Sequence, residues 1–258
     1  MTYEAIHYVE KDGAAWITLD RPEAFNAMTP AMNKEIKQAV KQADTSEAVR
    51  VLVFTGSGRS FCAGEDLEGV NEHTDHGEFL RSRYHPMLSA VEACGKPTVA
   101  LINGVAAGAG MSLALACDFR LMNEKAKFVS AFIDVGLVPD SGFLYYLTRI
   151  AGEAAALEMA VFSRPMDAAL ALEKGLATRT AAADSWEEEA FRFVQELAAK
   201  PTTAVRMIKR LVRQARRPEM EAFLEREAQA QRIAGKSADH QEGLAAFKEK
   251  RTPAFTGS

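Results

Sequence analysis

The sequence predicts an α/β fold, in which helices pack on a mostly parallel sheet, and three observations lead to this prediction. The first half of the chain repeats the order strand, loop, helix, which is typical of parallel strands joined by helices. The apolar runs at 49–55 and 98–102 are continuous rather than alternating, as expected for strands buried on both faces. From residue 152 onward nearly every stretch has helical periodicity, apart from a β-like segment at 177–181. We therefore expect a sheet-based core followed by a helical C-terminal region.

The chain begins with a predicted β-hairpin and a capped helix. Apolar segments at 6–10 and 15–20 flank a Lys-Asp-Gly turn at 11–13. Thr29 precedes a proline, and this pair is typical of a helix start because the threonine caps and the proline fits the first turn. A helix is therefore expected over 30–43.

The middle of the chain alternates glycine-rich loops with apolar segments. The second buried strand is followed by the loop GSGRSFCAGEDL at 56–67, which leads into a short helix. A polar loop is expected at 71–77 and a helix over 79–94. Gly-Lys-Pro at 95–97 ends that helix before the next strand.

The second half is expected to add two short strands and then helices. The strands are predicted at 119–122 and 128–130, and the loop IDVGLVPDSGF follows at 133–143. A helix starts at about residue 144. Pro201 and Pro218 are expected to begin new helices rather than to interrupt one.

Composition and charge exclude several classes of function. The formal net charge is −4 and no long basic run is present, so we expect no nucleic-acid partner. The apolar runs are too short to cross a membrane, and the charged N-terminus does not resemble a signal peptide. Three cysteines without metal-type spacing, Cys62, Cys94 and Cys117, fit a cytoplasmic protein without disulfides.

Two loops rich in small residues are the candidate site. SFCAGEDL at 60–67 and NGVAAGAGM at 103–111 both follow predicted parallel strands, and ligands bind where such strands end. The second loop runs into a helix N-terminus, whose unpaired N–H groups attract negative charge. The backbone N–H groups of Glu65 and Ala109 are the expected donors to one carbonyl oxygen, as in an oxyanion hole. The alternative is a tight turn in which glycine serves packing alone.

In six stretches the sequence resembles the enoyl-CoA hydratase/isomerase (crotonase) superfamily. They are LDRPEAFNAM at 19–28, SFCAGEDL at 60–67, INGVAAGAGMSLALACD at 102–118, AKF at 126–128, GLVPDSG at 136–142 and IAGKSADHQEGLAAFKEKRTPAF at 233–255. The resemblance implies a crotonase-type spiral of ββα units over 1–195 and a helical C-terminal trimerisation region over 196–258. It also implies a homotrimer or dimer of trimers, and an acyl-CoA substrate whose thioester carbonyl lies in the oxyanion hole. No separate cofactor is expected, because coenzyme A is part of the substrate.

The resemblance further indicates an isomerase rather than a hydratase. Hydratases of the family carry two glutamates over the substrate double bond, and the matching positions here are Ser112 and Phe132. Asp140 stands where isomerases with a single acid/base carry an aspartate; the other carboxylates expected nearby are Asp134 and Glu65. The closest likeness is to isomerases of ring-1,2-epoxyphenylacetyl-CoA in phenylacetate degradation. Asp140 is expected to remove a proton from the substrate and return it at another carbon, while the two N–H groups hold the enolate. An apolar wall is expected to raise the pKa of Asp140 and to exclude water.

Several alternatives remain open at this point. Asp140 could instead start a turn or cap the helix that follows it. His85 with Asp140 matches the base and nucleophile of the family's aromatic-acyl-CoA dehalogenases, although those carry Trp at the position of Phe132. An enoyl-CoA hydratase of fatty-acid or aromatic degradation, a hydrolytic member, and a non-catalytic acyl-CoA-binding protein are the other possibilities.

The resemblance also assigns residues to coenzyme A binding. They are Arg21, Ala24, Ala63, Asp66, Leu67 and Phe132, together with Phe247 and Lys250, which are expected to reach the coenzyme of a neighbouring subunit. The alternative for Lys250 is a solvated charge. His73 and His76 lie in the polar loop at 71–77 without a third strong ligand, so a solvated loop is expected there rather than a metal site.

Overall fold

Two β-sheets form the centre of the computed structural model, which describes residues 3–70, 73–215 and 220–254. Six strands make the larger sheet, in the order β1 (Ile6–Lys11), β2 (Ala14–Leu19), β3 (Val51–Gly56), β5 (Thr98–Ile102), β7 (Phe119–Asn123) and β10 (Arg179–Ala181). Four strands make the smaller sheet, in the order β4 (Ser60–Cys62), β6 (Val105–Ala107), β8 (Lys127–Val129) and β9 (Met166–Asp167). The hairpin of β1 and β2 is antiparallel, whereas β2, β3, β5, β7 and β10 run parallel, as predicted.

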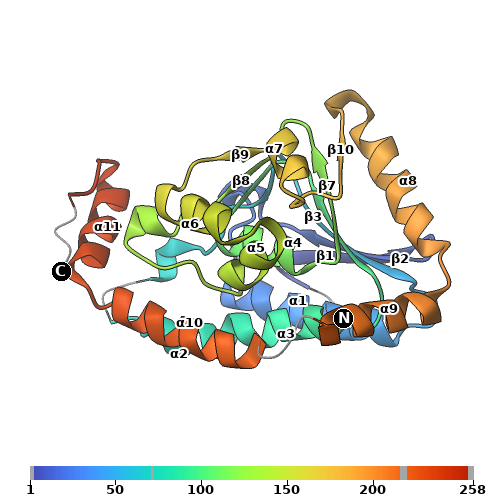
Figure 1. Ribbon diagram of the computed structural model, residues 1–258, viewed down its shortest axis with the longest axis horizontal. Helices are drawn as coiled ribbons and strands as arrows, with labels where there is room; N and C mark the ends of the chain where they lie inside the picture. The colour runs from blue at the N-terminus through green and yellow to red at the C-terminus, as the bar shows by residue number, and fades with distance from the viewer. Residues whose placement is uncertain (1–2, 71–72, 216–219, 255–258) are drawn as a thin grey trace.

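Successive strands alternate between the two sheets. β3, β5 and β7 join the larger sheet, and the strand after each of them, β4, β6 or β8, joins the smaller one. Each repeat therefore places one strand in each sheet before a helix returns the chain. This is the expected spiral of ββα units, and Figure 1 shows its strands crossing the middle of the molecule.

Helices surround the two sheets. They are α1 (Pro30–Thr45), α2 (His76–Phe79), α3 (His85–Ala93), α4 (Ala109–Ala116), α5 (Phe143–Ala151), α6 (Glu153–Phe162), α7 (Ala168–Glu173), α8 (Trp186–Ala198), α9 (Thr202–Ala215), α10 (Met220–Ala234) and α11 (Ala238–Glu249). A π-helical segment, η3 (Leu80–Tyr84), joins α2 to α3; the short 3-10 turns are η1 (Pro22–Ala24), η2 (Leu67–Gly69), η4 (Ile133–Val135) and η5 (Ala183–Ser185). The Thr29 hydroxyl accepts a hydrogen bond from the Met32 N–H, which confirms the predicted start of α1. Pro218 lies outside the described residues.

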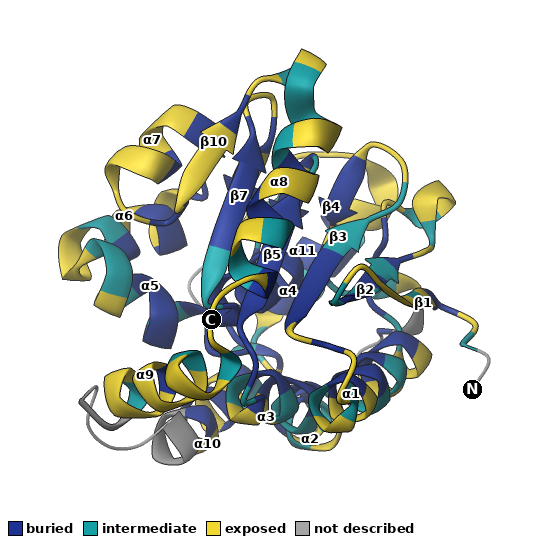
Figure 2. Ribbon diagram, turned by 90° about the vertical axis from the view of Figure 1, so that its right-hand side faces the viewer, coloured by how far each residue is buried: buried dark blue, intermediate teal, exposed yellow. Residues whose placement is uncertain are grey.

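The larger sheet is covered on both faces. Helix α8 lies across one face, where Phe193 and Val194 pack on valines and leucines of β3, β5 and β7 (Figure 2). The other face packs on α1, α3 and α4 through side chains such as Phe54 and Ile102. Burial on both faces explains why these strands read as continuous apolar runs in the sequence.

Two of the C-terminal helices, α9 and α10, pack against the layer of α1, α2 and α3. Arg81 of η3 pairs with Glu225 of α10, and Arg232 of α10 pairs with Asp75 at the start of α2. Helix α9 is held by Lys209, whose ammonium pairs with Asp118 at the start of β7. In Figure 1 these helices form the lower edge of the molecule, below the sheets.

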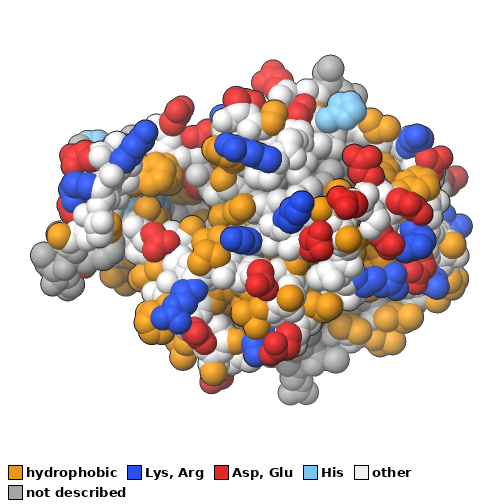
Figure 3. All heavy atoms as spheres, turned by 90° about the horizontal axis from the view of Figure 1, so that it is seen from above, with side chains coloured by type: hydrophobic (Ala, Val, Ile, Leu, Met, Phe, Trp, Pro, Cys, Tyr) orange, Lys and Arg blue, Asp and Glu red, His pale blue; other side chains and the backbone are white. Residues whose placement is uncertain are grey.

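No helix in the described parts of the chain is long and apolar enough to cross a bilayer. The face shown in Figure 3 carries basic and acidic side chains interspersed with apolar ones.

Candidate active site

The two small-residue loops meet beside the N-terminus of α4. A Cβ on Gly64 would lie only 3.1 Å from the Ala107 carbonyl oxygen and 3.5 Å from the Ala109 nitrogen. Gly64 also has φ of +97°, so both space and backbone conformation require glycine here. The loop is anchored by Met28, whose N–H donates to Gly64 and whose carbonyl accepts from the Asp66 N–H. The glycine thus brings the Glu65 and Ala109 backbones to the same place.

The two expected donor groups are unused within the described chain. None of its hydrogen bonds employs the N–H of Glu65 or of Ala109. Ala109 is the first residue of α4, and the first N–H groups of a helix have no intrahelical acceptor. Both N–H groups are therefore available to an external acceptor, as the donors of an oxyanion hole must be.

Asp140 is buried next to this place, with different surroundings for its two carboxyl oxygens. Oδ2 accepts a hydrogen bond of 2.8 Å from Nε2 of Gln231 on α10. Oδ1 is buried and has no hydrogen-bond partner among the described residues. Burial raises the pKa of Asp140 to about 6, whereas the nearby Ser141 hydroxyl and, to a smaller extent, the Gln231 bond act in the opposite direction. The carboxyl is therefore ionised at neutral pH but readily protonated, as suits a general base.

The backbone around Asp140 is fixed by three neighbours. The hydroxyl of Ser112, at 3.1 Å, donates to the Asp140 carbonyl oxygen, and the Gly142 N–H donates to the carboxyl of the buried Glu227 at 3.0 Å. Burial, together with the Asp140 charge, raises the pKa of Glu227 well above its usual value. Ser141 has φ of +56°, a left-handed conformation that costs energy for a residue with a side chain. The cap residue of α5 is Gly142 and no side chain caps this helix, so the alternative of Asp140 as a helix cap is wrong. Asp140 does start a turn, because its carbonyl oxygen accepts a hydrogen bond of 3.0 Å from the Phe143 N–H.

An aromatic wall lies beside the same loops. Phe132 is buried and packs edge-on against Phe143 with the ring centroids 5.6 Å apart. Its ring also lies 3.8 Å from the position that a Cβ on Gly108 would take. Asp134, in contrast, is exposed and accepts a hydrogen bond from Ser163, which holds the loop. The Asp134 carboxylate therefore stabilises the loop and is not part of the pocket.

The side chain of Glu65 belongs to the site as well. The buried Tyr84 hydroxyl donates a short hydrogen bond to Glu65 Oε2, and Oε1 lies 3.7 Å from the Arg83 guanidinium. Burial raises the pKa of Glu65 to about 8, and the charge of Asp140 acts in the same direction. The Asp140 charge also helps to raise the pKa of Tyr84, after burial and Glu65. Glu65, Tyr84 and Asp140 therefore form one electrostatically linked group.

His85 stands apart from this group. It is the first residue of α3, and its Nε2 is buried without a hydrogen-bond partner in the described chain. Burial lowers its pKa, and the charges acting on it are those of Arg81 and Glu225. No hydrogen bond joins His85 to Asp140 among the described residues, so their pairing stays a prediction.

The expectation of a solvated loop at His76 is wrong. His76 and His240 are both buried, with their Nε2 atoms 3.1 Å apart. His240 Nδ1 lies 2.7 Å from the Val135 carbonyl oxygen, which fixes Nδ1 as a donor. The local sequence is typical of a polar loop. It could not show that His76 is buried, because its partner His240 lies on a helix 164 residues further along the chain. Of the predicted loop, residues 71–72 lie outside the described chain, and His73 is exposed.

The residues assigned to coenzyme A lie along the outer edge of the same loops. Arg21 pairs with Asp66 at 2.8 Å and donates to the Ala27 carbonyl, so part of its role is to hold the loop that carries Leu67. Ala24 is half-buried in η1.

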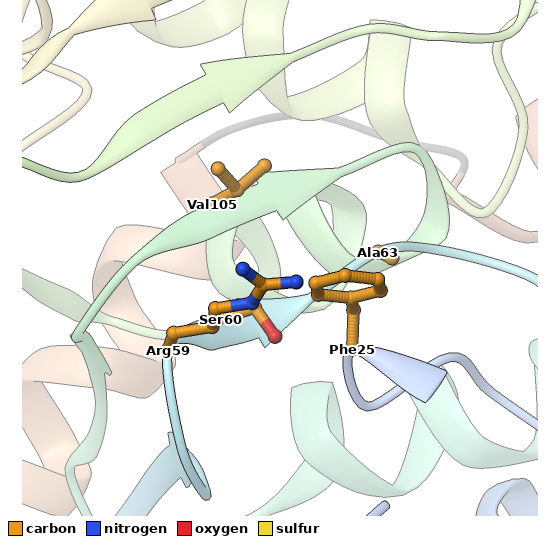
Figure 4. Close-up of a pocket in the computed structure, with 5 residues that line it drawn as sticks. All are labelled: Phe25, Arg59, Ser60, Ala63 and Val105. Atoms are coloured by element: carbon orange, nitrogen blue, oxygen red, sulfur yellow. The ribbon is translucent and has the colours of Figure 1, made fainter. Parts of the chain in front are cut away.

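A hollow of about 410 Å³ opens beside these residues, lined by Phe25, Arg59, Ser60, Ala63 and Val105 (Figure 4). The Arg59 guanidinium carbon lies 4.4 Å from the centre of the exposed Phe25 ring. An exposed aromatic ring with a neighbouring cation suits a flat heteroaromatic ring bearing phosphates.

Phe247 and Lys250 lie at the far end of α11. Both are exposed, and Lys250 ends the helix in a left-handed conformation. The helix packs on its own chain through His240 and Gly243, which contact η4. The contact of Phe247 and Lys250 with a neighbouring subunit stays a prediction.

Sequence reasoning missed three side chains of the site, namely Tyr84, Glu227 and Gln231. Glu227 and Gln231 are four residues apart on α10 and so face the same way, which is the only signal the sequence carried. Neither this spacing nor the position of Tyr84 indicates which loop they contact.

The chain is similar to known proteins in both sequence and fold. A profile of the enoyl-CoA hydratase/isomerase family matches residues 9–258. The chain is 36% identical to the 1,2-epoxyphenylacetyl-CoA isomerase of Escherichia coli over 98% of both sequences. It is 40% identical to a probable enoyl-CoA hydratase of Rhodobacter capsulatus over the full length of both. The crystal structure of an enoyl-CoA hydratase from Mycobacterium avium subsp. paratuberculosis matches with a TM-score of 0.91 and 32% identity, covering 99% of this chain and 100% of that one.

Proposed function

The chain belongs to the enoyl-CoA hydratase/isomerase family, and from that premise we propose that it is an acyl-CoA isomerase. In this proposal Asp140 is the acid/base group, and the N–H groups of Glu65 and Ala109 hold the thioester oxygen. The reaction shifts a double bond, or opens a ring epoxide, within the acyl group of the thioester. The 1,2-epoxyphenylacetyl-CoA isomerase of Escherichia coli is the relative whose printed activity this proposal follows.

The observation that carries the proposal is the free oxygen of a buried carboxylate beside two unused N–H groups. Asp140 Oδ1 has no partner in the described chain, whereas Ser112 and Phe132, at the positions of the two hydratase glutamates, are both engaged in packing. Neither a serine bonded to the Asp140 backbone nor a phenylalanine can activate a water molecule for addition. An isomerisation needs no water, so a carboxylate in an apolar pocket suffices.

The chemistry follows from these contacts. Asp140 takes a proton from the carbon α or γ to the thioester carbonyl, and the C–H electron pair moves into a dienolate. The negative charge that develops on the oxygen is stabilised by the N–H groups of Glu65 and Ala109. Return of a proton at the other carbon restores the carbonyl and moves the double bond. In the epoxide case the electron shift opens the three-membered ring towards the oxepin.

Two further proposals concern the setting of the reaction. The hollow at Phe25 and Arg59 supports binding of the adenine and phosphates of coenzyme A. In this proposal coenzyme A is part of the substrate, and the isomerisation uses no separate cofactor. The three cysteines are unpaired and buried, which supports a reducing, cytoplasmic location.

A panel of CoA thioesters tests the proposed function. Purified protein is incubated with 2-enoyl-, 3-enoyl- and ring-1,2-epoxyphenylacetyl-CoA, and products are identified by chromatography and mass. We expect isomers of unchanged mass. Products heavier by one water would identify a hydratase, and binding without turnover of any thioester would identify a non-catalytic acyl-CoA-binding protein.

A further inference from the structure

We propose that Glu65 acts through its side chain as well as its backbone: its carboxyl, held by Tyr84, is a second acid/base group that works opposite Asp140. The inference deepens the proposed function and rests on it. One carboxyl removes the proton from the substrate, and the other supplies the proton at the second carbon.

The position of Glu65 brings its carboxyl to the reacting atoms. An N–H that donates to the thioester oxygen places the Cα of the same residue within about 4 Å of that oxygen. The side chain then starts beside the carbonyl, and its carboxyl is near enough to Asp140 for the Asp140 charge to raise its pKa. Only 18% of the Glu65 side chain is exposed, so the carboxyl lies within the fold and not in bulk water.

Tyr84 fixes the orientation of this carboxyl. The tyrosine is 1% exposed and comes from η3, an element separate from the Glu65 loop. Its hydroxyl donates to Oε2, which leaves Oε1 to carry an acidic proton. Because the hydroxyl is the only donor of this buried side chain, its bond to Glu65 fixes the orientation of the Glu65 carboxyl relative to the substrate.

The surroundings give the two carboxyls opposite protonation states. Burial, with the Asp140 charge adding to it, raises the pKa of Glu65 to about 8, despite the opposing Tyr84 and Arg83. Burial raises the pKa of Asp140 only to about 6. Near pH 7 Glu65 therefore carries a proton while Asp140 does not. Neighbouring titratable groups whose surroundings push their pKa values apart in this way are typical of an acid and base pair.

The step balances without an added reactant. The Asp140 carboxylate accepts a proton from one carbon, and the C–H electrons form the dienolate. The O–H bond of Glu65 then breaks, its proton joins the other carbon, and the dienolate electrons form the new C–H bond. Asp140 is left protonated and Glu65 ionised. One proton lost to water by Asp140 and one gained from water by Glu65 restore both groups.

Isotope transfer distinguishes this path from a single shuttling carboxyl. With 3-enoyl-CoA in D₂O, a second acid introduces solvent deuterium at the protonated carbon in the first turnover. A single base that carries the proton across keeps the substrate hydrogen in the product. We expect deuterium in the product, measured by mass spectrometry of single-turnover samples. Full retention of the substrate hydrogen overturns the inference while leaving the proposed function intact.

Substitution of Glu65 gives the second test, because the backbone N–H survives. Glu65→Gln is expected to lower kcat roughly 10²–10⁴-fold, the usual range for loss of an acid/base group, with KM nearly unchanged. The wild-type pH profile should fall below about 6, where Asp140 is protonated, and above about 8, where Glu65 is ionised. The variant should lose the upper fall, and Tyr84→Phe should displace it.

Glu68→Gln is the matched control, since Glu68 is exposed on the same loop. Its kcat and pH profile should equal those of the wild type. Wild-type kcat in Glu65→Gln overturns this inference alone. Inactivity of the wild type toward every thioester in the panel overturns the proposed function, and this inference with it.

Discussion

At the scale of single residues, the two oxygens of the Asp140 carboxyl have separate roles. Gln231 occupies Oδ2, and the free Oδ1 is left for a substrate proton. Ser112 and Glu227 hold the backbone on either side, so the carboxyl is fixed by contacts that leave its reactive atom open. Both predictions at this scale concern that arrangement.

Asp140→Asn is expected to abolish isomerisation and leave CoA-thioester binding nearly intact. Asparagine keeps the shape of aspartate but cannot accept the proton. Loss of a general base costs roughly 10²–10⁴-fold in rate, and Ser112 and Phe132 offer no replacement. Steady-state kinetics and calorimetric titration with a non-reacting acyl-CoA check the two parts. Normal turnover in this variant, combined with inactivity of His85→Ala, would instead favour the dehalogenase-like pair.

Gln231→Leu is expected to raise the pKa of Asp140, because the amide hydrogen bond stabilises the ionised form. A hydrogen bond to a charged group contributes about 1.5–3 kcal/mol, which corresponds to about 1–2 pH units. The acid limb of kcat/KM should therefore move upward from about 6. Gln229→Leu, an exposed position on the same helix, is the control and should leave the profile unchanged. An unmoved acid limb in Gln231→Leu contradicts the prediction.

At the scale of elements, a histidine pair joins α2 to α11. Because His240 Nδ1 donates to Val135, its Nε2 is an acceptor, and His76 must donate from its own Nε2. If His240 were protonated, its Nε2 would also carry a hydrogen and would face the Nε2–H of His76, so that two donors would meet. The neighbouring charges are Asp75 and Arg232, which pair with each other at 2.9 Å. Both rings are therefore held in the neutral form.

Acid should consequently loosen the C-terminal helices. Burial lowers the pKa of His76 from 6.5 to about 4, with the His240 ring adding to the effect. The unfolded chain takes up the proton first, so this contribution is complete above pH 6.5 and is lost as the pH falls towards 4. The loss amounts to roughly 3 kcal/mol.

Urea denaturation at several pH values measures this loss. Between pH 6.5 and 4 the free energy of unfolding of His76→Phe should fall less than that of the wild type. The exposed His7 provides the control, His7→Gln, whose profile should follow the wild type. Identical pH profiles for His76→Phe and the wild type contradict the assignment.

At the scale of the whole molecule, one helix face is left uncovered. Met207, Ile208, Leu211 and Val212 of α9 are between 41% and 63% exposed. Exposed apolar side chains gathered on one element typically mark an interface. We propose that a second copy of the chain covers this face within a trimer or a pair of trimers, with Phe247 and Lys250 directed to a neighbour's site.

Sedimentation equilibrium tests the assembly. We expect a mass of three or six times 28.1 kDa at micromolar concentration. Leu211→Arg should shift the distribution to smaller species, because a charge in an apolar contact is costly to bury. Val9→Arg, at an exposed position of the edge strand β1, should leave the mass unchanged. A fully active wild-type monomer would contradict the prediction.

The sequence by itself determined those features of this protein that depend on neighbours along the chain. The hairpin, the Thr29 cap, the buried parallel strands and the two small-residue loops all follow from local patterns, and the structure confirms them. The two loops also led to the prediction of Glu65 and Ala109 as site positions, and the family resemblance led to that of Asp140. Each such signal is short because turns, caps and strand alternation involve only a few consecutive residues.

Only the tertiary structure decided which distant side chains meet. Gln231 reaches Asp140 across 91 residues, and His240 buries His76 across 164. In the sequence these glutamine and histidine residues are indistinguishable from polar residues of a solvated face. Their surroundings change once α10 and α11 pack on the core, since burial and hydrogen bonding depend on contacts in space and not on order along the chain. The same packing sets the protonation states of Glu65 and Asp140, on which the proposed chemistry depends.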